Sequence, residues 1–147
     1  MPIIAKTLEE TKAAAHRLAP DVKIGVPLLL YGDLGAGKTE FAREVIHALA
    51  KGAGMKPDAL GDIPSPTFSL LQLYDLGAAE IAHYDLYRVK SADELTELDF
   101  DESLRNRIVI IEWPELAEPL IKNAIRVKIS LEGEARKIEI SEKKCSL

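Results

Sequence analysis

The apolar residues of this chain fall into short runs and alternating stretches that predict the strands of a sheet. The predicted strands cover residues 26–31, 67–74, 81–85, 108–111, 125–129 and 137–140. The run at 108–111 is continuous and β-branched, which is typical of a strand buried on both faces. A glycine turn separates the second strand from the third, and another separates the last two, so both pairs are predicted to form antiparallel hairpins.

Between these strands, apolar residues follow the spacing of helices. Thr7 and Glu10 form a capping-box pattern, which predicts a helix from there to about Leu18. A longer helix is predicted from Thr39 to Lys51. Its predicted core face comprises Phe41, Val45, Ala48 and Leu49. Shorter helices are predicted after Ser91, at 101–105 and at 115–121. This order predicts an α/β fold with a parallel central sheet, antiparallel hairpin strands at the edges and helices on both faces.

Size and composition narrow the class of protein. The chain is predicted to be a single domain over residues 1–147, with an ordinary hydrophobic content of 47%. No apolar run is long enough to cross a membrane and no secretory signal is apparent, so a cytoplasmic protein without membrane contact is expected. The single cysteine, Cys145, excludes an internal disulfide and is expected to be an exposed thiol. The net charge of −5 argues against broad nucleic-acid binding by the isolated chain.

The most informative motif lies at residues 32–39, where Gly-Asp-Leu-Gly-Ala-Gly-Lys-Thr fits the phosphate loop G-x-x-x-x-G-K-[ST]. A predicted strand precedes the motif and a predicted helix follows it. This order favours a true phosphate loop over a chance match in a glycine-rich turn. Lys38 is expected to reach the β and γ phosphates, and the hydroxyl of Thr39 to bind Mg²⁺. The expected nucleotide-binding residues here are Asp33, Leu34, Gly35, Ala36, Gly37, Lys38, Thr39 and Glu40. The sequence therefore predicts a P-loop nucleoside triphosphate hydrolase fold.

Two acidic residues follow predicted strands and are candidates for catalysis. Glu112 comes directly after the run at 108–111, and Asp85 ends the strand at 81–85. A carboxylate at a strand end beside a phosphate loop can hold Mg²⁺ or orient water. The rim position of Glu112 favours such a role, whereas spacing alone leaves Asp85 open between a site residue and a surface acid. His83 is expected to be a structural histidine bonded to backbone rather than a catalytic base.

Two further positions beside the loop have alternative interpretations. A hydroxyl of Ser65 or Thr67 could contact Mg²⁺ or the γ-phosphate, as in nucleotide switches, but ordinary turn chemistry is favoured by the residues alone. Many phosphate-loop proteins carry a second hydroxyl where this chain has Glu40. We expect the Glu40 carboxylate to point away from phosphate, and the affinity for ATP alone to be modest.

Taken together, four segments resemble the bacterial TsaE (YjeE) family, the ATPases of tRNA threonylcarbamoyladenosine synthesis. They are residues 32–39, Ser-Pro-Thr-Phe-Ser-Leu at 65–70, His-Tyr-Asp-Leu-Tyr-Arg at 83–88 and Ile-Glu-Trp-Pro-Glu at 111–115. The resemblance implies that Asp85 and Glu112 join Thr39 at Mg²⁺ and that Thr67 belongs to a switch-like loop. It also implies that Trp113 lies near the nucleotide.

The resemblance further implies a function. The expected activity is a Mg²⁺-dependent ATPase, weak alone and stimulated by partners, that resets a complex of proteins resembling TsaD and TsaB. Those partners perform the threonylcarbamoyl transfer, tRNA is reached only through them, and the isolated chain is expected to be a monomer. The alternatives are a small-molecule kinase, for which no arginine-rich lid is apparent, and a GTPase, for which the Asn-Lys-x-Asp motif is missing.

Overall fold

A computed structural model describes residues 2–143 of the chain, so Cys145 lies outside the described residues. Its strands are β1 (Ile3–Ala5), β2 (Leu28–Tyr31), β3 (Leu71–Asp75), β4 (Glu80–Asp85), β5 (Ile108–Glu112), β6 (Ala124–Glu132) and β7 (Ala135–Lys143). Its α-helices are α1 (Leu8–Leu18), α2 (Lys38–Gly52), α3 (Ala92–Glu97) and α4 (Phe100–Asn106). Three short 3₁₀ helices are η1 (Ala19–Asp21), η2 (Pro114–Leu116) and η3 (Glu118–Leu120).

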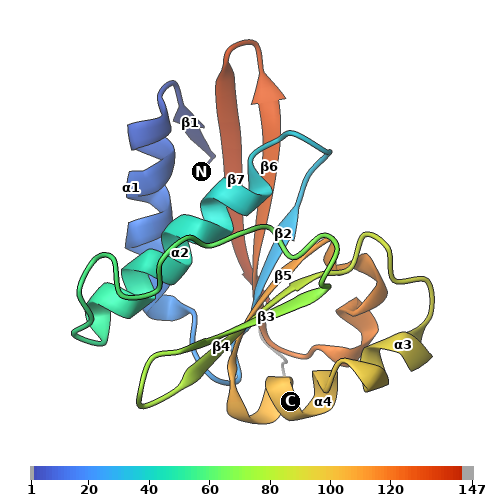
Figure 1. Cartoon of the computed structure of the whole chain (residues 1–147). Coiled ribbons are helices and arrows are strands. Elements are labelled where there is room, and N and C mark those ends of the chain that lie inside the picture. The colour runs from blue at the N-terminus through green and yellow to red at the C-terminus, as the bar shows by residue number, and fades with distance from the viewer. Residues whose placement is uncertain (1, 144–147) are drawn as a thin grey trace.

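The strands form one seven-stranded sheet in the order β1-β7-β6-β2-β5-β4-β3 (Figure 1). β2 runs parallel to both of its neighbours, β5 and β6, and β4 runs parallel to β5. β3 forms an antiparallel hairpin with β4, and β7 forms one with β6. β1 pairs antiparallel with β7. The predicted parallel centre with antiparallel hairpin strands is therefore confirmed. The carboxyl ends of β2, β4 and β5 consequently meet at one edge of the sheet, where ligands bind in open α/β sheets.

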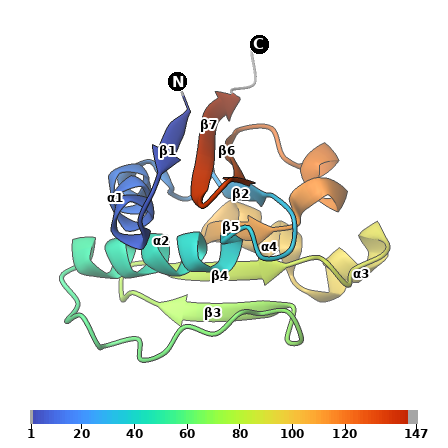
Figure 2. The same cartoon turned by 90° about the horizontal axis from the view of Figure 1, so that it is seen from above.

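Helices cover both faces of the sheet (Figures 1 and 2). On one face, α1 and α2 pack on alternate residues of the central strands, among them Leu28, Leu30 and Ile110. On the other face, the intervening residues Leu29 and Ile111 pack with Phe100 of α4 and with residues of α3 and η2. This alternation explains why β2 and β5 read as continuous apolar runs in the sequence. Within residues 2–143, no helix combines the length and apolar character needed to cross a bilayer.

Several sequence predictions of local structure were wrong in detail. The strand predicted at 67–74 begins only at Leu71, because Leu70 adopts a left-handed conformation (φ 68°) and its N–H donates to the carbonyl of Pro66. The helix predicted at 115–121 is a pair of 3₁₀ turns, and Pro119, which has no N–H to donate, lies where one α-helix would have to continue. The strand β1 was not predicted.

The core face of α2 was also predicted only in part. Phe41 and Val45 are buried, but Ala48 and Leu49 are only half-buried. The remaining buried apolar positions are Ala42, Ile46 and Ala50. In contrast, the N-cap of α1 is as predicted, because the Thr7 side chain accepts from the backbone N–H of Glu10 at 3.2 Å.

Candidate functional site

The phosphate loop connects the end of β2 at Tyr31 to the start of α2 at Lys38. Two of its glycines are required by their surroundings. A Cβ on Gly32 would lie 2.4 Å from the carbonyl oxygen of Ile129, so no larger residue fits there. Gly37 has φ 107°, which favours glycine, and no side chain caps the start of α2 there. The first N–H groups of α2 therefore face the loop without a side-chain cap, as an anion site requires.

Lys38 is buried (5% exposed) and lies folded back on its own loop. Its ammonium donates to the carbonyl of Gly32 and, at 3.4 Å, to that of Asp33. It also lies 3.3 Å from the ring centroid of Trp113, as a cation–π contact. Burial lowers the pKa of Lys38, and the nearby acids, chiefly Glu112 and Asp85, oppose that shift. Within residues 2–143 the ammonium of Lys38 is therefore held by neutral groups, the loop carbonyls and the Trp113 ring, and forms no salt bridge.

Glu112 ends β5 and is buried (2% exposed) between two hydrogen-bond partners. Its Oε1 accepts from the Thr39 hydroxyl at 2.7 Å, and its Oε2 lies 2.7 Å from His83 Nε2. The expectation that His83 bonds to backbone was therefore wrong. In the parallel register, Asp85 pairs with Glu112 and His83 with Ile110, so the histidine lies two residues below the strand ends.

Asp85 ends β4 and is also buried (3% exposed). Its two oxygens accept from the Thr67 hydroxyl at 3.1 Å and from the backbone N–H of Tyr87 at 3.0 Å. Thr67 lies 2.7 Å from the hydroxyl of Ser65, so the loop that precedes β3 is tied to Asp85 through Thr67. Of the two candidate switch hydroxyls, Thr67 is the one that contacts an acid of the site.

These groups surround one cleft of about 230 Å³. Its lining comprises Leu34, Gly35, Gly37, Lys38, Thr39, Glu40, Thr67, Asp85, Glu112, Trp113 and Arg136. Most of the site residues predicted from the sequence are thus brought together. Of the remaining two, Ala36 is buried in the core, and Asp33 faces a different groove.

No pattern in the sequence pointed to Arg136, which lies on β7 and lines the cleft. Its guanidinium donates to the Glu40 carboxylate at 2.7 Å and would lie 3.0 Å from a Cβ on Gly37. Glu40 therefore borders the cleft, and its charge is paired rather than turned fully away from it. Arg136 also lines a small neighbouring pocket of about 140 Å³, together with Thr7 and Glu134.

The donor set of the cleft fits a hard cation. Hydroxyl oxygens of Thr39 and Thr67 and carboxylates of Asp85 and Glu112 are the kind of oxygen ligands that Mg²⁺ prefers. Within residues 2–143, no group of three or more His, Cys, Asp or Glu side chains forms a preassembled metal site. A cation bound here would need further oxygens from phosphates or water, which is usual for Mg²⁺.

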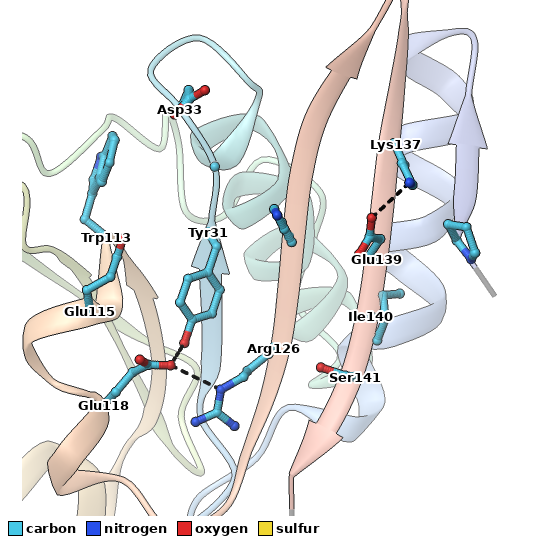
Figure 3. Close-up of a pocket in the computed structure, with 13 residues that line it drawn as sticks. Tyr31, Asp33, Trp113, Glu115, Glu118, Arg126, Lys137, Glu139, Ile140 and Ser141 are labelled. Carbon is cyan, nitrogen blue, oxygen red and sulfur yellow. Dashed lines mark hydrogen bonds and ion pairs between the residues drawn. The ribbon is translucent and has the colours of Figure 1, made fainter.

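Trp113 also lines a larger groove, of about 910 Å³, so this residue borders both the phosphate cleft and the groove (Figure 3). Near its centre, Glu118 accepts from the hydroxyl of Tyr31 and, at 3.3 Å, from Nε of Arg126. Burial and the bond to Glu118 raise the pKa of Tyr31. On β7, Lys137 and Glu139 form an ion pair at 3.2 Å. The central charges of this groove are therefore paired with one another.

A family model described as "Threonylcarbamoyl adenosine biosynthesis protein TsaE" matches residues 5–140. The chain belongs to the TsaE family. A TsaE protein of Rickettsia felis is 42% identical over 131 residues, which are 88% of this chain and 71% of the relative. A TsaE protein of Mycobacterium tuberculosis H37Rv is 37% identical over 132 residues, covering 83% of this chain and 74% of the relative. Both are named tRNA threonylcarbamoyladenosine biosynthesis proteins.

The fold of this TsaE-family chain is also found in a solved structure. The crystal structure of Bacillus subtilis YdiB matches it with a TM-score of 0.68 and 28% identity, covering 97% of this chain and 84% of that protein. The likeness confirms the P-loop α/β fold. The phosphate loop, the acids of β4 and β5 and Trp113 all lie within the residues that the TsaE model matches.

Proposed function

We propose that this TsaE-family chain binds ATP with Mg²⁺ and hydrolyses it in support of tRNA threonylcarbamoyladenosine modification. The observation that carries the proposal is the meeting of Lys38, Thr39, Asp85 and Glu112 at the phosphate-loop cleft. Three of these side chains are charged and almost fully buried, although burial of charge is costly. Buried charged side chains are typically found where they act on a ligand.

Each residue has a role in this proposal. Lys38 leaves the loop carbonyls and donates to the β and γ phosphates, while the N–H groups at the start of α2 bind phosphate oxygens. Mg²⁺, when held by the Thr39 hydroxyl and the acids of the cleft, would neutralise charge on the phosphates. Glu112 orients the attacking water and accepts its proton, so that the products are ADP and inorganic phosphate.

The rim of the cleft supports an action on partner proteins. Leu34 lines the cleft and is 69% exposed, and Phe68, next to Thr67, is 81% exposed. Tyr87 packs against Trp113 with the two rings tilted by 54° and their centroids 4.8 Å apart. Exposed apolar side chains around a nucleotide site suit a partner that covers the site. We propose that the partners are proteins resembling TsaD and TsaB, that they perform the threonylcarbamoyl transfer in the cytoplasm, and that tRNA is reached through them. The isolated chain is proposed to be a monomer.

The deciding experiment is ATP turnover by the purified chain, alone and with both candidate partners, with Lys38→Ala as control. The proposal expects slow turnover alone and a large rise that needs both partners and an intact Lys38. ATP binding without any response to the partners would contradict it. Transfer of the phosphate to a metabolite instead of water would favour a small-molecule kinase.

A further inference from the structure

His83 is a fully buried histidine whose one hydrogen bond goes to the proposed catalytic acid. Its side chain is 0% exposed, and Nε2 lies 2.7 Å from Oε2 of Glu112. A carboxylate oxygen only accepts, so Nε2 carries the hydrogen and donates. Among the described residues, Nδ1 of this ring has no hydrogen-bond partner. A ring that leaves one nitrogen unsatisfied in the core is costly to keep, and stabilisation of the core alone does not explain it.

We propose that His83 is a positioning residue that fixes the orientation of the Glu112 carboxylate toward the phosphate cleft. The inference rests on the proposed ATPase function. It assigns His83 no contact with the nucleotide, because the ring is buried beneath the strand ends and does not line the cleft.

Glu112 has two restraints, the Thr39 hydroxyl on Oε1 and His83 on Oε2. If the Thr39 hydroxyl turns to Mg²⁺ when nucleotide binds, its bond to Oε1 is given up. The bond from His83 then remains as the restraint on the carboxylate, so that Oε2 is held in the core and Oε1 faces the cleft. Such a donor limits rotation of the acid and keeps it near the geometry that catalysis needs.

The backbone makes this restraint rigid. His83 lies on β4 and Glu112 on β5, and the two strands are paired in parallel register over their whole contact. Side chains on paired strands hold their spacing better than side chains on loops. The bond also links the two strands that carry the acids of the site. Asp85 lies at the end of β4 and pairs with Glu112 at the end of β5.

Three substitutions separate positioning from packing. His83→Gln keeps an N–H donor close to the position of Nε2, His83→Asn has the same amide one methylene too short, and His83→Leu has no donor. We expect His83→Asn and His83→Leu to lower kcat for ATP by about ten- to hundredfold, as for loss of a hydrogen bond to a charged group, with KM changed little. We expect His83→Gln to restore most of kcat, although its melting temperature is also reduced.

A second readout does not depend on turnover. The gain in ADP affinity on adding Mg²⁺ is measured by calorimetry for the wild type, the three variants and Glu112→Gln. We expect this gain in affinity to be smaller in His83→Asn and His83→Leu than in the wild type. Combining either substitution with Glu112→Gln should reduce the gain no further than Glu112→Gln alone, because His83 acts through the Glu112 carboxylate.

The outcomes are distinguishable from those of the proposed function. Equal kcat and equal Mg²⁺ gain for His83→Gln and His83→Asn, or additive losses with Glu112→Gln, would overturn the positioning role. A wild-type chain that does not hydrolyse ATP under any condition would contradict the ATPase itself, and the Mg²⁺ gain would still decide the role of His83.

Discussion

Two carboxylates, Glu112 at the phosphate cleft and Glu118 at the larger groove, have similar partners and contrasting surroundings. Glu112 bridges a hydroxyl and a histidine, and Glu118 bridges a hydroxyl and an arginine. The side chain of Glu118 is 37% exposed in the large groove, whereas that of Glu112 is buried at the small phosphate cleft. Hydrogen bonds to a half-exposed carboxylate add modest stability to the fold. A buried carboxylate instead carries a large desolvation cost that its partners must offset. Burial of charge, rather than the size of a hollow, therefore locates the candidate site.

Lys38→Ala should produce the greatest loss of function at the phosphate cleft. Removal of the main phosphate cation should weaken ATP binding by about a hundredfold or more, because charge-assisted bonds to phosphate are lost. Calorimetric titration with ATP measures the loss. The matched control is Lys128→Ala in the groove, which should stay within about twofold of the wild type. Similar losses in both variants would remove the distinction between the two hollows.

Glu112→Ala compared with Glu118→Ala tests the two carboxylates directly. We expect Glu112→Ala to lower kcat by about a hundredfold while ADP affinity measured without Mg²⁺ changes only a few-fold, since the acid acts on the attacking water and on Mg²⁺ rather than on the nucleotide itself. We expect Glu118→Ala to lower thermal stability and to leave kcat nearly unchanged. Single-turnover kinetics with bound ATP give the rates, and full hydrolysis by Glu112→Ala would refute its catalytic assignment.

Glu40→Thr tests whether the paired acid at the start of α2 limits affinity. A hydroxyl there can donate to phosphate, and Arg136 would lose its carboxylate partner, so ATP affinity should rise by a few-fold. Glu44→Thr, one turn further along α2, is the control, because its carboxylate faces His16 and not the cleft. Unchanged or weaker binding in Glu40→Thr would show that the carboxylate does not limit affinity.

Tyr31→Phe tests the groove and should have the smallest effect on the site. The substitution removes the hydroxyl that donates to Glu118, which should lower the free energy of unfolding by about 1 kcal/mol. Denaturation in urea measures this change. ATP affinity should remain within about twofold, because Tyr31 lines the groove and not the cleft. A large loss of affinity would instead show that the two hollows are coupled through Trp113.

The sequence predicted those parts of the site that depend on local order along the chain. The phosphate loop needs only a strand, glycines and a helix start, and Glu112 is recognisable because it directly follows a continuous apolar run. Contacts set by strand register were not predictable. The bond between His83 and Glu112 depends on the pairing of β4 with β5, and Arg136 reaches Glu40 across 96 positions of sequence. Leu70 ends the predicted strand early through its backbone conformation, which its residue type does not indicate.

Trp113 is the only tryptophan in the sequence, and the ammonium of Lys38 lies 3.3 Å from the centroid of its ring. A charge so close to an indole changes the energy of its excited state, so the emission of this protein depends on where that lysine lies. Movement of Lys38 from the ring to a phosphate should therefore alter the fluorescence of the unlabelled chain. Trp113, which lines both the cleft and the groove, is thus an intrinsic fluorescent reporter of events at the phosphate cleft, and it requires no dye and no substitution.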